Sequence, residues 1–98
     1  MPAEEPITRR VIVEGFVQGV GYRHFAYHAA SRLGLSGWVC NRADGTVEAL
    51  ISGPPEAIEA MLAELRRGPR GARVVSVILA EAVGAEWTPE AFEIRPTA

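Results

Sequence analysis

Residues 9–34, RRVIVEGFVQGVGYRHFAYHAASRLG, decide the fold, because they contain a complete passage from a strand into a helix. The β-branched residues from Arg9 to Val17 are typical of a strand, and the glycine-bearing segment 15–21 ends it. From His24 to Leu33 the apolar residues recur at helical spacing, and Gly34 follows as a stop signal. We therefore predict a strand over 9–17 and a helix over 24–33.

The remainder of the chain supplies four further elements and a short last strand. Strands are predicted over 37–41 and 46–52 around an Asp-Gly turn, with two more over 73–81 and 92–95. A second helix begins after Gly53-Pro54-Pro55 and ends before Gly68-Pro69. It carries an amphipathic stripe at Ile58, Met61, Leu62 and Leu65. The order β-α-β-β-α-β predicts an α+β, ferredoxin-like sandwich, with two helices on one face of a single antiparallel or mixed sheet and a short terminal strand.

The length indicates one domain. Ninety-eight residues fall within the range of a single hydrophobic core. We expect a flexible tail over residues 1–6, which are acidic and interrupted by proline, and one domain over residues 7–98. The start differs from the basic start of a signal peptide, and no apolar run is long enough to span a bilayer. A cytoplasmic monomer that does not bind membranes is expected.

The composition argues against several classes of partner and of reaction. The net charge of −2 and the lack of basic stripes argue against a nucleic-acid partner. All ten basic residues are arginine, so lysine chemistry is excluded. One cysteine allows no internal disulfide, and two histidines with one cysteine make no convincing zinc site. An anionic ligand would therefore need a locally positive site.

Two unusual segments should meet at one edge of the sheet. A right-handed crossover makes the first and second strands parallel, so the segments after them, 15–23 and 41–45, lie at the same edge. The first segment holds three glycines and ends at Arg23. Its backbone N–H groups, the helix N-terminus and the guanidinium could together bind phosphate oxygens. A glycine-rich turn beside a surface arginine explains the composition equally well.

Elimination leaves few chemistries for such a site. The nucleotide P-loop spacing and the dinucleotide glycine fingerprint are absent, Cys40 has no arginine six positions later, and Asp44 is the only aspartate. Asn41 could orient a water molecule but cannot act as a base at neutral pH, and it could equally cap its own turn. No nucleophile–base pair is evident.

The residues from Gly15 to Arg23, GFVQGVGYR, closely resemble the first acylphosphatase signature. Gly37-Trp38-Val39-Cys40-Asn41, followed by Gly45, Val47 and Gly53, resembles the second, and the resemblance covers residues 7–95. Tyr22 stands where phenylalanine is usual, and Cys40 where a polar residue or alanine is usual. The family does not use either position for chemistry.

The resemblance implies hydrolysis of a carboxyl–phosphate anhydride, with a small acyl phosphate as substrate and no cofactor or metal. It implies two catalytic residues, Arg23 and Asn41, of which Asn41 holds the attacking water. The phosphate-binding residues that it implies are Gln18, Gly19, Val20, Gly21, Tyr22 and Arg23, through their backbone amides and the Arg23 side chain. Two alternatives stay open: a non-catalytic ferredoxin-like binding module, and a domain of a larger hydrogenase-maturation carbamoyltransferase.

Five other side chains are candidates for a functional role: His24, His28, Cys40, Trp38 and Trp87. His24 and His28 lack an evident third ligand and are interpreted as ordinary helix residues, although His24 could touch the rim of the site. Cys40 should point to the face opposite Asn41 as an inert hydrophobic residue. Trp38 and Trp87 are interpreted as packing residues.

Overall fold

The protein's computed structural model describes residues 5–80 and 90–97. Its elements are β1 (Ile7–Phe16), α1 (Tyr22–Arg32), β2 (Ser36–Asn41), β3 (Val47–Gly53), α2 (Pro55–Arg67), β4 (Arg73–Ala80) and β5 (Phe92–Ile94). The predicted order is confirmed, and most boundaries move by one or two residues. Most of the predicted N-terminal tail, the predicted end of the fourth strand at Glu81, and Trp87 lie outside the described residues.

The start of α1 is the boundary that matters for the site. The helix begins at Tyr22 instead of His24, because Gly21 adopts a left-handed conformation (φ 77°) and lets the chain enter the helix at once. Arg23 therefore lies in the first turn of α1. At the other end, Gly34 (φ 72°) ends the helix as predicted, with Leu35 N donating to the Ala30 carbonyl at 2.9 Å.

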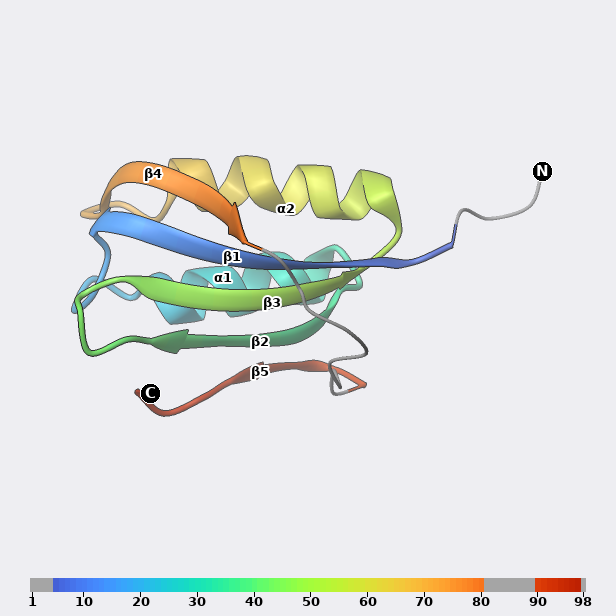
Figure 1. Ribbon diagram of the computed structural model, residues 1–98, viewed down its shortest axis with the longest axis horizontal. Helices are drawn as coiled ribbons and strands as arrows, with labels where there is room; N and C mark the ends of the chain where they lie inside the picture. The colour runs from blue at the N-terminus through green and yellow to red at the C-terminus, as the bar shows by residue number, and fades with distance from the viewer. Residues whose placement is uncertain (1–4, 81–89, 98) are drawn as a thin grey trace.

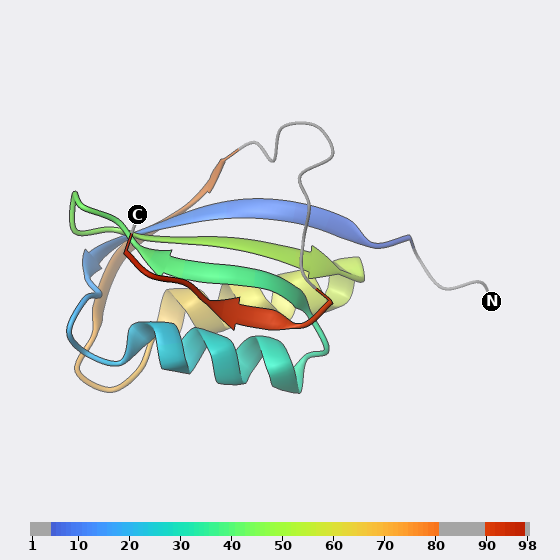
Figure 2. The same cartoon turned by 90° about the horizontal axis from the view of Figure 1, so that it is seen from below.

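The five strands form one mixed sheet in the order β4-β1-β3-β2-β5. β1 runs antiparallel to both β3 and β4, β2 runs antiparallel to β3, and β5 is parallel to β2. Both helices cover the same face of this sheet (Figures 1 and 2). This is the α+β, ferredoxin-like arrangement predicted from the element order.

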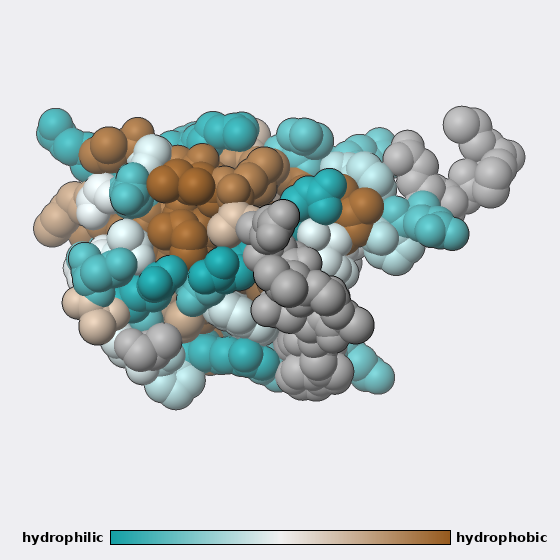
Figure 3. Space-filling view, viewed as in Figure 1, coloured by the Kyte–Doolittle hydropathy of each residue, from teal (hydrophilic) through white to brown (hydrophobic). Residues whose placement is uncertain are grey.

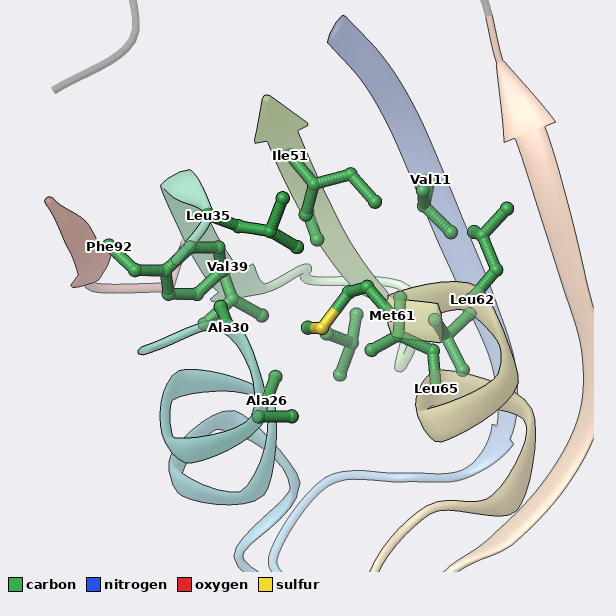
Figure 4. Packing of buried hydrophobic residues seen from close by; sticks show 14 of the residues in the cluster. Val11, Ala26, Ala30, Leu35, Val39, Ile51, Met61, Leu62, Leu65 and Phe92 are labelled. Carbon is green, nitrogen blue, oxygen red and sulfur yellow. The ribbon is translucent and has the colours of Figure 1, made fainter. Parts of the chain in front are cut away.

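The hydrophobic core lies between the sheet and the helices (Figure 4). Strand residues such as Val11 and Ile51 and helix residues such as Met61 and Leu65 are fully buried there. α1 contributes mainly alanines to this core, which lets the helix approach the sheet closely. The opposite face of the sheet is open and carries a mixture of apolar and charged side chains (Figure 3). The Arg10–Glu48 ion pair, with 2.5 Å between Nε and Oε2, lies on this open face.

Candidate active site

The loop after β1 and the turn after β2 lie at the same end of the sheet, as the topology predicts (Figures 1 and 2). Side-chain hydrogen bonds join them directly, since Gln18 Nε2 donates to the carbonyl oxygens of Arg42 and Thr46 at 2.8 Å each. The two unusual segments of the sequence therefore form one unit.

The loop owes its shape to two glycines in the left-handed region. Gly19 has φ 75° and Gly21 has φ 77°, whereas a Cβ added at either position would meet no heavy atom within 4 Å. The backbone conformation, and not crowding, is what favours glycine here, because an L-residue at such angles costs about 1–2 kcal/mol.

The N-terminus of α1 presents unpaired donors to this loop. Phe25 N makes the first intrahelical bond, to Gly21 O at 3.0 Å, so the amides of Tyr22, Arg23 and His24 belong to the first turn that a helix leaves without partners. The N-cap residue is Gly21, which makes no side-chain hydrogen bond, and the first turn of the helix contains no acidic residue. The positive end of the helix therefore remains available to an anion.

A pocket of about 190 Å³ lies where these features meet. It is lined by Val17, Gly19, Gly21, Tyr22, Arg23, His24 and Asn41. Its volume is below the roughly 300–1,000 Å³ of pockets that enclose drug-sized ligands. The pocket therefore suits a small ligand, or the head group of a larger one.

Arg23 is held against the end of β5. Its Nη1 atom donates to the Arg95 carbonyl oxygen at 3.3 Å, and Arg95 N in turn donates to Val39 O of β2 at 2.8 Å. The guanidinium of Arg95 lies over the Trp38 ring, 5.0 Å from its centroid, which supports the packing interpretation of Trp38. The sequence identified Arg23 but gave no signal for the carbonyl that holds it.

Asn41 reaches the pocket from the last position of β2. It pairs with Val47, whose side chain is in the core, so the Asn41 side chain points to the helix-covered face. Its Oδ1 atom is buried and has no hydrogen-bond partner among residues 5–80 and 90–97. Asn41 is nevertheless one of the residues that line the pocket, so another part of its side chain or backbone faces that space.

Cys40 faces away from the pocket, as predicted, and is buried opposite Glu48. Burial raises the pKa of its thiol, and the Glu48 charge adds to this rise, while the nearby Arg42, Arg95 and Arg23 lower the pKa in opposition. Three arginines therefore lie near the end of β2, on a chain whose net charge is −2.

The side chains of the predicted phosphate-binding residues differ in where they lie. The Tyr22 ring is buried in the core, Val20 packs against the core, and the Gln18 amide bonds to the β2–β3 turn. At these three positions only the backbone N–H remains to meet a ligand. Arg23 is the one residue of the set that brings a charged side chain to the pocket.

The two histidines separate in the structure. His24 lines the pocket, whereas His28 is exposed and packs edge-on against Tyr27. Within residues 5–80 and 90–97, no group of three or more His, Cys, Asp or Glu side chains could hold a metal ion. In the same residues, no helix has both the length and the apolar character needed to cross a membrane.

A second hollow, of about 340 Å³, lies beside the β2–β3 turn and is lined by Arg10, Arg42, Ala43, Asp44 and Glu48. Its two arginines are matched by two carboxylates, and Arg10 is already paired with Glu48. It therefore lacks the excess of donors that a phosphoryl group requires, and the smaller pocket is the better candidate.

Comparison with known proteins gives a consistent result. The acylphosphatase family model matches residues 9–94. A protein of Koribacter versatilis named acylphosphatase is 50% identical over 90 residues, which are 92% of this chain and 81% of that protein. The crystal structure of acylphosphatase from Bacillus subtilis superposes with a TM-score of 0.83 at 36% identity, covering 90% of this chain and 97% of that one. Full-length HypF in a phosphate- and nucleotide-bound form matches 98% of this chain but only 13% of its own, with a TM-score of 0.79 at 27% identity.

Proposed function

The chain belongs to the acylphosphatase family, and we propose that it hydrolyses acyl phosphates to a carboxylate and inorganic phosphate at the pocket between the β1–α1 loop and Asn41. The observation that carries this proposal is the convergence of Arg23, the free amides of the first turn of α1, and Asn41 on one small pocket. Arg23 comes to this pocket from the first turn of α1, and Asn41 comes to it from the end of β2.

The phosphoryl group would be bound by the Arg23 guanidinium and by the backbone amides of residues 18–23. Phosphoryl transfer depends mainly on positioning and on stabilising charge over the equatorial oxygens. Donors that are fixed by the backbone lose little freedom when the substrate binds, and the helix N-terminus adds a favourable field. This set of groups meets both requirements without a nucleophile from the protein.

Asn41 would hold the attacking water. The water oxygen forms a bond to phosphorus while the bond from phosphorus to the acyl oxygen breaks, and its electron pair leaves on the carboxylate. A carboxylate is a good leaving group, so this step requires no general acid. The proton of the water passes to a phosphoryl oxygen of the substrate. The place of Asn41 in the lining of the pocket supports this role, because a side-chain amide has both a donor and an acceptor with which to orient a water.

The test is phosphate release from benzoyl phosphate, with a chelator present, by the wild type and three variants. We expect Arg23→Ala to lower kcat/KM by at least about 10²–10³-fold and to weaken inhibition by inorganic phosphate, as for a lost oxyanion donor. Arg32→Ala is the matched control, because it removes the same charge from the exposed far end of the same helix.

Asn41→Ala should lower kcat while leaving the inhibition constant of phosphate almost unchanged. A near-normal kcat in this variant would remove the water-holding role. Absence of phosphate release by the wild type would refute the enzymatic function and would favour a non-catalytic binding module.

A further inference from the structure

The side chain of Gln18 connects the two halves of the pocket. Its Nε2 atom donates both of its hydrogens, one to Arg42 O and one to Thr46 O, at 2.8 Å each. These acceptors are 24 and 28 residues away in the sequence and flank the β2–β3 turn. Building on the proposed function, we propose that Gln18 is a positioning residue: it fixes this turn, and with it Asn41, against the phosphate-binding loop.

The geometry of the turn explains why one amide group is sufficient. Arg42 N donates to Thr46 O at 2.9 Å, and Gly45 N donates to Arg42 O at 3.1 Å. The two carbonyls that close the turn are therefore the same two that accept from Gln18. Asn41 is the residue directly before Arg42, so a shift of the turn would carry the Asn41 side chain with it.

This hydrogen bonding also distinguishes the Gln18 side chain from a phosphate ligand. Both Nε2 hydrogens are used within the protein, and the remaining polar atom, Oε1, is an acceptor. An acceptor offers nothing to a phosphoryl oxygen. The backbone amide of Gln18 stays among the groups proposed to bind phosphate, and the side chain acts through Asn41.

The experiment compares Gln18→Met, which keeps length and removes both donors, with the wild type in the benzoyl phosphate assay. We expect kcat to fall about 10–100-fold, because a displacement of about 1 Å at a reacting group can cost about 10²-fold. KM and the inhibition constant of phosphate should stay within about threefold, since the loop amides and Arg23 remain. Thr8→Val is the matched control, because it removes a cross-strand hydrogen bond to Ser52 (3.0 Å), away from the residues that line the pocket, and should leave kcat unchanged.

A double-mutant cycle separates positioning from a general structural effect. In an Asn41→Ala background, Gln18→Met should cause less than about a twofold further loss of kcat, because the group that it positions is already gone. Additive losses, or a rise in the phosphate inhibition constant alone, would overturn the proposal. A wild type that releases no phosphate would instead refute the proposed function.

Hydrogen exchange tests the link between Gln18 and the β2–β3 turn without an activity assay. Amide hydrogen exchange of Arg42 and Gly45 reports the two turn bonds directly. Gln18→Met should speed exchange at both amides by about tenfold or more while core strand amides keep their protection. Unchanged protection at the turn would overturn the proposal whether or not the protein is active.

Discussion

Tyr22→Phe is expected to destabilise the protein by removing a buried hydrogen bond that the tyrosine hydroxyl makes. The Tyr22 hydroxyl donates to the Leu65 carbonyl near the end of α2 at 2.6 Å. In a continuing helix that carbonyl would accept from the amide four residues later, but residue 69 is proline and has no N–H. The tyrosine hydroxyl therefore supplies the donor that the helix end cannot.

The size of the effect follows from burial. Tyr22 is only 2% exposed and Leu65 is fully buried, so water cannot replace the lost donor without rearrangement. Leaving a buried carbonyl without a partner costs about 1–3 kcal/mol. For a domain of this size that corresponds to a fall in Tm of about 5–20 °C.

Urea denaturation followed by far-UV circular dichroism at pH 7 measures this loss. Tyr27→Phe is the matched control, because it removes the same hydroxyl from the same helix at a residue that is 37% exposed. Its free energy of unfolding should change by less than about 0.5 kcal/mol. If the Tyr22→Phe variant loses no more stability than the Tyr27→Phe variant, the capping role of the hydroxyl is refuted.

The pH dependence of the free energy of unfolding provides a second test of the Tyr22 hydroxyl. Burial raises the pKa of Tyr22 above its usual value of about 10, because the folded protein favours the neutral phenol. Below pH 10 this contribution is fully present. Above it the unfolded chain loses the proton first, so stability falls by up to about 1.4 kcal/mol per pH unit. The stability gap between wild type and Tyr22→Phe should therefore narrow from pH 9 to pH 11, and a constant gap would contradict the assignment.

Three further predictions concern Gly15, Asp44 and the buried thiol of Cys40. Gly15→Ala should cost more than about 4 kcal/mol in urea unfolding, because its Cβ would lie 2.1 Å from the Arg73 carbonyl, against about 1–2 kcal/mol for Gly45→Ala in open space. The pKa of Asp44 is lowered by hydrogen bonds from the hydroxyl and the amide two residues later, so its contribution to stability is present above about pH 4 and lost as pH falls further. Asp44→Asn should therefore lower stability at pH 5 and flatten the acid dependence, as urea unfolding at pH 3 and pH 5 can measure. Cys40 should react with a thiol reagent at pH 7 only on unfolding, and rapid labelling of the folded protein would contradict its burial.

The sequence was sufficient for the features that depend on local pattern. Gly34 ends α1 because the backbone there is left-handed, which glycine tolerates and which the spacing of apolar residues anticipates. The meeting of the Arg23 and Asn41 segments follows from the handedness of a β-α-β connection, which needs only the element order. Both kinds of inference use rules that hold for any chain with that pattern.

The features that the sequence missed are tertiary hydrogen bonds between distant groups. Gln18 reaches a turn 24 residues away, Arg23 reaches the carbonyl of Arg95, and Tyr22 reaches the end of α2. In each case a backbone carbonyl is the acceptor, and every residue type has one, so composition carries no signal for it. Such contacts depend on where the polar group of a side chain lies in the folded protein. The periodicity of apolar residues in the sequence does not determine this position.

The same hydrogen bonds bear on whether Asn41 serves its own turn or a ligand. The turn is closed by the Arg42–Thr46 backbone bond, by Asp44, whose Oδ1 accepts from Thr46, and by the Gln18 side chain. None of these bonds uses the Asn41 side chain, and its Oδ1 remains buried without a partner. The turn is therefore closed without the Asn41 side chain, which leaves that side chain available for the proposed role of holding water.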